Sequence, residues 1–427
     1  MLDIKFIREN PDLVKENMKK KFMEDKIDLV DGLIKSDEEY RKLLQEAEKL
    51  RHERNAVTSK INDAKKTGGD VTELLAQAKD IPQKIKDTEE KMKLLKQEIM
   101  NNLAGIPGII HESVPIGKDE SENVEIKKWG EPRGFDFPVK NHVELCENLG
   151  LADFDSSAKT SGNGFYFLKG DLGLLQQALI RFAIDHMLQK GYQYIEPPLM
   201  IHESILAAAM DLEGFKQSIY KVDQDDLCLI GTSEFSLLGM HVNEAIPEKD
   251  LPKKYFAYSM CFRKEIGAHG INEKGLWRTH QFNKVEMFAF CKPEDSYKHF
   301  DEMLQASEEL MQALGIPYRL LEMCSGDLSL WKAKQIDIEV WRPTTKDYGE
   351  VTSLSNCTDF QARNLGIKFV KSDGTREVPH TLNNTVIATS RTMVAILENF
   401  QNADGSVTVP EVLRPYMNNI ERIIPKK

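Results

Sequence analysis

The chain has 427 residues, of which 29% are charged and 41% are hydrophobic, so it is too long for one ordinary domain and predicts two or three. Its formal net charge of −11 disfavours a nonspecific nucleic-acid binder, although a local basic patch is compatible with it. The mean hydropathy of −0.43, and the lack of any run of about 18 apolar residues, predict a protein without a membrane-spanning segment.

The first 35 residues predict a short helical lead-in. Their opening, MLDIKFIREN, is charged from Asp3 onward and lacks the apolar stretch of a secretory signal. Pro11 followed by Asp12 is typical of a helix start. The six cysteines are scattered along the chain without a CxxC pair, which argues against a disulfide framework or a thiolate zinc site. Reduced thiols and a cytoplasmic location are therefore expected.

Residues 36–104 predict an antiparallel helical hairpin. Apolar residues recur every three or four positions, and the tetrapeptide TGGD at residues 67–70 breaks the pattern in the middle. Two helices of about 30 residues, each rising 1.5 Å per residue, would form an arm of roughly 45 Å. Pro82 lies inside the returning helix and should kink it.

The ascending half of this hairpin is locally basic, and Arg51, Arg54 and Lys60 are its candidate contacts with a nucleic acid. A charged helix face that simply meets solvent is the plain alternative. A projecting arm with excess positive charge is also suited to a phosphate backbone. Taken with the rest of the chain described below, the second reading is the expected one.

A linker is predicted at residues 111–133, where prolines and glycines are scattered, so the chain divides into residues 1–110, the linker, and a globular domain at 134–427. Residues 172–191 predict a helix that ends at a glycine. Residues 192–200 predict a strand stopped by two prolines. Residues 227–237 predict another strand, on which Thr232 and Glu234 would share a face.

The most informative stretch predicts two strands, residues 255–265 and 277–290, joined by a charged loop that contains Gly267, Gly270 and Gly275. Side chains alternate across a strand, so Arg263 and Glu265 would share one face of the first strand. One face of the second strand would carry His280, Phe282, Lys284, Glu286 and Phe288.

Charged side chains on a buried sheet face are costly unless they are paired or solvated. The hairpin therefore predicts a polar cleft. The alternative is an amphipathic hairpin whose outer face meets solvent.

A further strand pair is predicted at residues 336–340 and 348–356. Glu350 and Ser353 on the second strand are three residues apart, so they would share a face only at a bulge or a strand end.

Residues 381–401 predict a polar strand, which contains Asn383 and Thr385, and then an apolar helix with Arg391 in its first turn. A cation there opposes the helix macrodipole, and an anionic ligand would resolve the conflict. An exposed surface arginine is the alternative, which the apolar neighbours disfavour.

Taken together, these stretches resemble the three class motifs of the class II aminoacyl-tRNA synthetases. The central hairpin resembles motif two, written fRxE, a loop, then HQFxxxE, in a wording close to that of the seryl-tRNA synthetase family. The helix and strand at residues 172–200 resemble motif one, which forms the dimer interface in the family, and residues 381–401 resemble motif three. Thr232 and Glu234 resemble the serine-binding TxE element. The chain departs from the family at Gly349, where a basic residue is usual, and at Trp331, where a smaller residue is usual.

The resemblance covers essentially the whole chain and implies an α+β fold. This fold is an antiparallel mixed sheet with flanking helices, plus an N-terminal antiparallel α-helical coiled-coil arm. It implies ATP-dependent formation of seryl-adenylate, followed by transfer of serine to the 3′ end of tRNA(Ser), by a homodimer that uses ATP and Mg²⁺. The alternatives are a paralogue that activates another amino acid or charges a non-tRNA carrier, and a catalytically inactive or re-purposed paralogue that acts as a binding protein. Retention of Arg263, Glu350 and Arg391 counts against inactivity.

The resemblance also implies roles for individual residues. The catalytic pair is Arg263, which suits the α-phosphate and the serine carboxylate, and Arg391, which suits the γ-phosphate. The other implied nucleotide and metal contacts are Phe282 under the adenine, Glu265 at its amino group, and Glu350 with Ser353 at magnesium. The implied serine contacts are Glu234 at the ammonium, Glu286 with Thr385 at the hydroxyl, and Thr232 and Asn383 in the same pocket.

Overall fold

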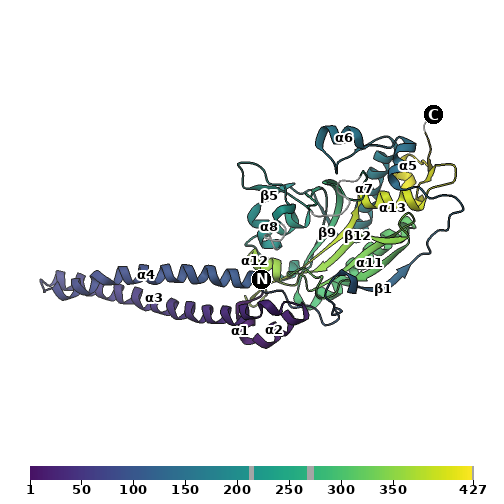
Figure 1. Cartoon of the computed structure of the whole chain (residues 1–427). Helices are drawn as coiled ribbons and strands as arrows, with labels where there is room; N and C mark the ends of the chain where they lie inside the picture. Colours follow the sequence, from purple (N-terminus) through teal and green to yellow (C-terminus); the bar gives the residue numbers. More distant parts are fainter. Residues whose placement is uncertain (211–215, 267–273, 426–427) are drawn as a thin grey trace. The chain divides into compact units, whose positions relative to one another are not determined.

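The computed structural model describes residues 1–210, 216–266 and 274–425, and it divides into two compact units, Met1–Ile109 and Ile110–Lys427 (Figure 1). The first unit is entirely helical over its described elements. The second unit is built on an eight-stranded sheet. None of the helices that the structure describes combines the length and the apolar character needed to cross a lipid bilayer.

The first unit confirms the predicted helical hairpin. Two short helices, α1 (Ile4–Glu9) and α2 (Pro11–Lys20), precede the long helices α3 (Asp28–Lys66) and α4 (Thr72–Ala104), which form the arm (Figure 1). The turn between α3 and α4 falls at the predicted glycines, and Gly68 adopts a positive φ of 70° there. Helix α3 begins earlier than residue 36, because Val30 and Leu33 on its first turns are buried against the lead-in helices.

Two separate apolar clusters stabilise this unit. The base cluster joins the lead-in helices to the lower arm and includes Ile7, Val14, Ile99 and Leu103. The distal cluster is built around Val57, Ile61, Ile81 and Ile85, with four partly buried residues packed against it. These positions belong to the three-to-four spacing that the sequence displays, so the heptad pattern correctly predicts which faces of α3 and α4 meet.

The second unit has a mixed sheet of eight strands, as the fold class predicts. The strand order is β1-β10-β11-β12-β15-β9-β8-β4, and every neighbouring pair is antiparallel except β4 with β8. In chain order the strands are β1 (Val124–Trp129), β4 (Gln193–Ile195), β8 (Lys253–Phe262), β9 (Gln281–Cys291), β10 (Tyr318–Glu322), β11 (Lys334–Arg342), β12 (Asp347–Asn356) and β15 (His380–Ala388).

Helices cover both faces of this sheet, and alternation along β9 determines which residues meet which helices. Val285, Met287 and Ala289 pack into the larger core with α5 (His142–Leu149), α7 (Asp171–Gln189), α11 (Ser296–Leu314) and α13 (Thr389–Asn399). Phe288 and Phe290 point to the opposite face, into a second core with α8 (Glu203–Ala209), α10 (Glu234–Gly239) and α12 (Phe360–Asn364). Glu286 has the same parity as Phe288, so this opposite face also carries the polar side chains of β9.

Short elements complete the unit. They are helix α6 (Phe154–Ser161), the pairs β2 (Ala152–Asp153) with β3 (Phe167–Leu168), β5 (Met200–His202) with β6 (Leu227–Leu229), and β16 (Val407–Thr408) with β17 (Arg422–Ile423), and a three-stranded sheet of β7 (Ala245–Pro247), β13 (Lys368–Val370) and β14 (Arg376–Glu377).

The expectation of a linker at residues 111–133 is wrong in part. Strand β1 lies inside this segment and pairs with β10 as the edge of the main sheet. Its apolar side chains Val124 and Ile126 are about half exposed, as an edge strand permits. The prolines that suggested a linker flank β1, where they cost no ladder hydrogen bond.

Candidate active site

The site is built on the hairpin β8–β9. Lys284 and Glu286 lie on the polar face of β9, as alternation predicts, whereas the first strand ends at Phe262 and not at residue 265. Arg263 still continues the ladder, because its backbone N–H donates to the oxygen of His280 at 2.9 Å. Gly267 and Gly270 of the predicted loop lie outside the described residues.

Arg263 is fixed by two contacts next to the strand end. Its Nε donates to the backbone oxygen of Gly231 at 3.1 Å, and its guanidinium carbon lies 5.3 Å from the centre of the Phe282 ring, within the range of a cation–π contact. Arg263 lines two adjacent cavities. Glu265 lines both cavities as well, so these two residues join them.

The first cavity, of about 50 Å³, brings together most of the residues predicted to contact the nucleotide. Its lining includes Arg263, Glu265, Phe282, Glu350, Thr385 and Arg391, with Trp277, Arg278 and Lys284 beside them. Arg278 was not singled out in the sequence, yet its Nη1 donates to Glu265 Oε2 at 3.2 Å. Arg278 lies two residues before His280, so the alternation that identified the polar face of β9 could have indicated it.

Arg391 lies in the first turn of α13, as predicted, and it is paired with Glu350. Its Nη1 donates to the backbone oxygen of Glu350 at 2.8 Å and to Oε2 at 3.0 Å. Desolvation in the cleft would raise the pKa of Glu350, but the charge and hydrogen bond of Arg391 and the charge of Arg263 outweigh it and hold that pKa below its ordinary value. The Glu350 carboxylate thus offsets the cation at this helix N-terminus, where the sequence predicts an anionic ligand.

Glu350 and Ser353 share one face because β12 carries the bulge that the sequence required. Thr352 pairs with Ile338 and Glu350 pairs with Glu339, which leaves Val351 as the extra residue. The same register places Ser353 opposite Asp337, a buried residue that sequence reasoning missed. Asp337 lies within the predicted strand at 336–340, but only the register of β11 against β12 indicates which residue it faces.

The donor set at this bulge fits a divalent cation. Burial, and then the negative charge of Glu350, raise the pKa of Asp337 to about 7. Two carboxylates and a hydroxyl thus lie together, and a bound cation would favour the ionised form of Asp337. Hard cations such as Mg²⁺ prefer oxygen ligands of this kind.

The second cavity, of about 310 Å³, lies on the other side of Arg263. Thr232 and Glu234 line it, together with Trp331 and Lys332. The predicted strand at residues 227–237 is wrong beyond Leu229, because Glu234 begins helix α10. Thr232 and Glu234 therefore reach the cavity from a turn and a helix start.

Glu234 is buried, and two side-chain amides donate hydrogen bonds to its carboxylate. Gln361 Nε2 donates to its Oε1 at 2.7 Å and Asn383 Nδ2 donates to the same oxygen at 3.1 Å. Burial, and then the charge of Glu286, raise the pKa of Glu234. A cationic ligand group would relieve this effect, because an opposite charge favours the ionised carboxylate.

Glu286 and Thr385 lie opposite each other in the β9–β15 register, beside a bulge at Val386. Glu286 Oε2 forms a buried ion pair with Lys284 Nζ at 2.5 Å, and Lys284 also donates to Thr232 Oγ1 at 3.3 Å. The predicted hydroxyl-binding residues are thus together, and Lys284 links them to the TxE element.

The two departures from the family pattern face the site. A Cβ on residue 349 would lie 2.4 Å from Cζ2 of Trp277, so the indole occupies the space that a side chain at this position would need. Trp331 is buried and lines the second cavity.

The predicted contacts on the arm are exposed. Arg51 pairs with Glu89 across the hairpin at 2.7 Å, Arg54 donates to Asn55 at 3.3 Å, and Lys60 lies on the same helix. Their role in nucleic-acid binding stays a prediction.

Comparisons with known proteins match both units. Residues 1–110 match the model of the seryl-tRNA synthetase N-terminal domain, and residues 219–400 match the tRNA synthetase class II core domain (G, H, P, S and T). The chain is 47% identical to a serine–tRNA ligase of Methanocella arvoryzae, over 99% of this chain and 100% of that relative. It is 44% identical to a serine–tRNA ligase of Pyrococcus horikoshii, over 100% of this chain and 98% of that relative.

Solved structures agree with these sequence matches. The crystal structure of seryl-tRNA synthetase from Pyrococcus horikoshii complexed with ATP is similar with a TM-score of 0.93 at 44% identity, and each chain is covered completely. The cytoplasmic serine–tRNA ligase of Naegleria fowleri in complex with AMP is similar with a TM-score of 0.88 at 33% identity, covering 100% of this chain and 99% of that one. With both units matched over their length, the chain belongs to the seryl-tRNA synthetase family of class II aminoacyl-tRNA synthetases.

Proposed function

We propose that this chain ligates serine to tRNA(Ser) in two steps, ATP-dependent formation of seryl-adenylate and transfer of the seryl group to the 3′ end of the tRNA. The observation that carries the proposal is that Arg263 lines both cavities of the site. The two substrates of the first step, ATP and serine, must meet at the α-phosphate and the serine carboxylate. A single guanidinium can bind both oxyanions there.

In the first step the serine carboxylate attacks the α-phosphorus and pyrophosphate leaves. Such a transfer depends on placement and charge stabilisation more than on covalent help. Phe282 would stack under the adenine, and Glu265, held by Arg278, would accept from the amino group. Arg391 would exchange Glu350 for the γ-phosphate, which also frees the Glu350 carboxylate.

Glu350 and Ser353, with Asp337 beside them, would hold Mg²⁺, which when bound neutralises phosphate charge. The ion pair with Arg391 supports this assignment, because it shows that the Glu350 carboxylate already binds a cationic group. The protein's own contribution is to keep the two oxygen ligands on one face through the bulge at Val351.

In the second cavity, Glu234 would accept from the serine ammonium, while Glu286 and Thr385 would hold the hydroxyl and Thr232 and Asn383 would complete the wall. A pocket built to hydrogen-bond a hydroxyl rejects alanine, because its polar groups would stay unpaired. Rejection of threonine would have to be steric.

For the second step, the arm with Arg51, Arg54 and Lys60 would bind the tRNA(Ser) backbone, and residues 1–110 would act as the tRNA-binding domain. We place the enzyme in the cytoplasm as a homodimer. All six cysteines are unpaired and buried, which supports a reducing compartment.

The test is serine-dependent exchange of labelled pyrophosphate into ATP, followed by charging of tRNA(Ser). Exchange with serine, but not with alanine or threonine at equal concentration, is the expected result. Exchange driven by a different amino acid would assign the chain to a paralogue with another substrate. No exchange with any amino acid would show that the chain is an inactive binding protein.

A further inference from the structure

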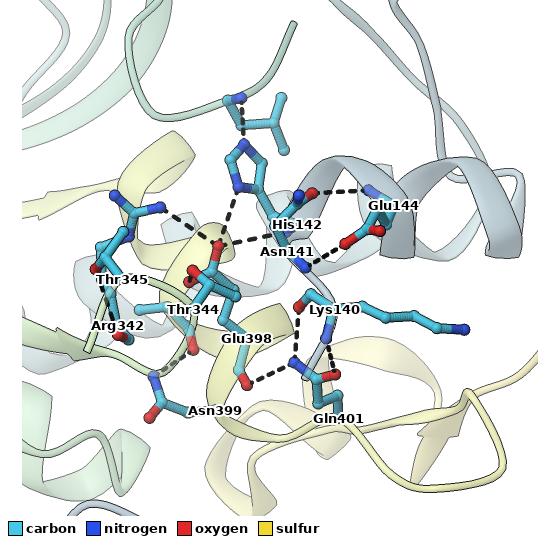
Figure 2. Close-up of polar contacts among 12 residues, drawn as sticks. Lys140, Asn141, His142, Glu144, Arg342, Thr344, Thr345, Glu398, Asn399 and Gln401 are labelled. Carbon is cyan, nitrogen blue, oxygen red and sulfur yellow. Dashed lines mark hydrogen bonds and ion pairs between the residues drawn. The ribbon is translucent and has the colours of Figure 1, made fainter. Parts of the chain in front are cut away.

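A buried carboxylate, Glu398, lies on α13 about two helical turns after Arg391. It is fully buried and accepts hydrogen bonds from three residues (Figure 2). The donors are the backbone N–H of His142 at 3.3 Å, His142 Nδ1 at 3.1 Å, Arg342 Nη2 at 3.4 Å and Thr344 Oγ1 at 2.8 Å. Burial would raise the pKa of Glu398, but the hydrogen bond from His142 and the charge of Arg342 outweigh it and keep that pKa below its ordinary value. Glu398 is therefore an ionised anchor.

The other ring nitrogen of His142 reaches the returning end of the loop between β8 and β9. The backbone N–H of Leu276 donates to His142 Nε2 at 3.1 Å. Since Nε2 accepts, Nδ1 carries the hydrogen that it donates to Glu398, so one neutral tautomer satisfies both contacts. A Cβ on Gly275 would lie 2.6 Å from Nε2, so the chain can approach the imidazole this closely only with glycine there.

Arg342 forms a second link from Glu398 to the same segment. Its guanidinium lies 4.2 Å from the centre of the Trp277 ring, and the guanidinium of Arg391 lies 5.5 Å from that ring. Arg391 Nε also donates to the backbone oxygen of Trp277 at 3.4 Å. Leu276 is therefore held by His142, and Trp277 by Arg342. Trp277 in turn contacts Arg391, so the series of contacts runs from Glu398 to Arg391.

Further hydrogen bonds hold the segment around His142 in place. Helix α5 begins at His142 with a capping box between Asn141 and Glu144. Gln401 binds Lys140 reciprocally, since its Nε2 donates to the Lys140 oxygen and its Oε1 accepts from the Lys140 N–H, both at 2.9 Å (Figure 2). The start of α5 is thus tied to the end of α13 at Gln401 as well as at Glu398.

We propose that His142 is a positioning residue of the ATP site. Anchored by Glu398, it fixes Leu276 and Trp277, and through Trp277 it sets the orientation of the Arg391 guanidinium toward the nucleotide phosphates. The proposal rests on the proposed function for the identity of the nucleotide. It assigns His142 no contact with substrate, so its loss should weaken ATP binding and leave the serine pocket unchanged.

The test measures the Kd for ATP by calorimetry and the KM for ATP and for serine in the exchange assay. His142→Leu should raise the Kd and the KM for ATP about tenfold, because a small misplacement of a positioned group is costly. The KM for serine should stay within twofold. His142→Gln should retain most of the ATP affinity, since an amide can donate to Glu398 and accept from Leu276, whereas the shorter His142→Asn should not.

The matched control is His299→Leu. His299 is another buried histidine bonded to a glutamate, Glu302, at 3.0 Å, but it lies on α11, which contributes no residue to the lining of either cavity of the site. A comparable loss of thermal stability without a change in ATP affinity is expected for this control.

Three results would overturn the proposal: an unchanged Kd for ATP in His142→Leu, an equal rise of both KM values, or a His142→Gln variant as impaired as His142→Asn. Additivity gives a further check. In an Arg391→Ala background, His142→Leu should have little further effect on the Kd for ATP, and a full tenfold effect there would also contradict the proposal. Because ATP binding is read directly, a wild-type protein without serine exchange would refute the proposed function and leave this test standing.

Discussion

Arg391 and Glu350 form an ion pair on the phosphate side of the site, with Nη1 of the arginine 3.0 Å from Oε2 of the glutamate. Each side chain thereby offers the other the charge that a nucleotide phosphate or a metal ion would offer on binding. The pair joins α13 to β12, so it also orders the two elements that meet at the phosphate site.

Arg391→Ala should abolish most serine-dependent pyrophosphate exchange while leaving the fold intact. Loss of a charge-assisted hydrogen bond to a transferring phosphate costs on the order of 3 kcal/mol, or about a hundredfold in rate. Arg422→Ala is the control, because this arginine is exposed and its ion pair with Asp404 is 3.7 Å long. Exchange at the parent rate in Arg391→Ala would show that motif three is wrongly assigned.

Glu286→Gln should weaken the discrimination of serine from alanine, because the carboxylate that accepts from the serine hydroxyl becomes an amide. About 2 kcal/mol, roughly thirtyfold, is the expected scale for one mispaired polar group. Glu302→Gln provides a matched control, since Glu302 also pairs with a lysine, Lys254, at 2.7 Å. The measurement is the ratio of kcat/KM for the two amino acids, and an unchanged ratio in Glu286→Gln would rule out the role.

Gly349→Ala should impair ATP binding by displacing Trp277. The new Cβ would meet Cζ2 of the indole at 2.4 Å, and overpacking of this kind typically costs about 1–3 kcal/mol. Combining it with Trp277→Leu should recover part of the loss, because the smaller side chain makes room. A double variant whose loss in ATP affinity equals the sum of the two single losses would show that the residues do not compete for space.

The stability of the protein should depend on pH through Asp337, whose pKa is raised to about 7 by burial and by Glu350. Between pH 4 and 7 the folded chain keeps a proton that the unfolded chain has released, so the free energy of unfolding falls as the pH rises and levels off above 7. The slope from this group reaches about 1.4 kcal/mol per pH unit. Asp337→Asn should remove it, which urea unfolding from pH 5 to 8 can measure. A parent-minus-variant difference that stays constant over this range would contradict the shift.

Shortening the arm should separate adenylate formation from tRNA charging. Replacing residues 50–88 by a short Gly/Ser link removes the distal cluster, Arg51, Arg54 and Lys60, and keeps Ile99 and Leu103 in the base cluster. The Arg51–Glu89 pair at 2.7 Å shows that the two cut ends lie close together. The shortened protein should exchange pyrophosphate normally and fail to charge tRNA.

A milder version changes Arg51, Arg54 and Lys60 to Glu. The salt slope of log K for tRNA should fall by roughly 0.7–0.9 for each phosphate whose neutralising side chain is removed. Three exposed lysines of the second unit, changed to Glu in the same way, control for net charge: Lys128, Lys249 and Lys368. Parent-level charging by the shortened protein would mean that the arm is not needed for tRNA recognition.

Sequence patterns predicted the parts of this molecule that depend on local periodicity. The alternation along residues 281–291 correctly separated Glu286 from Met287, and the three-residue spacing of Glu350 and Ser353 correctly required the bulge at Val351. The arm was predicted equally well, because the apolar residues on the faces where its two helices meet repeat in heptads. In each case the sequence pattern that predicts the structure lies within one helix or strand, or at one turn.

The parts that sequence reasoning missed depend on how elements are registered against one another. Asp337 becomes part of the site only because β11 pairs with β12 so that Ser353 faces it. His142 and Glu398 are 256 residues apart, and nothing near either residue indicates the other. The sequence of strand β1 predicts a linker because its six residues include charged ones and bury little surface. The strand is stabilised by its pairing with β10, which the sequence does not display.

The two clusters within the first unit share no residue, so the length of the arm can vary independently of its foundation. Inserting or deleting one heptad in each long helix would change its reach by about 10 Å and restore the same inter-helix packing. Under the proposed function, such a change in the length of the hairpin should alter which tRNA molecules it can bind, without disturbing the base cluster.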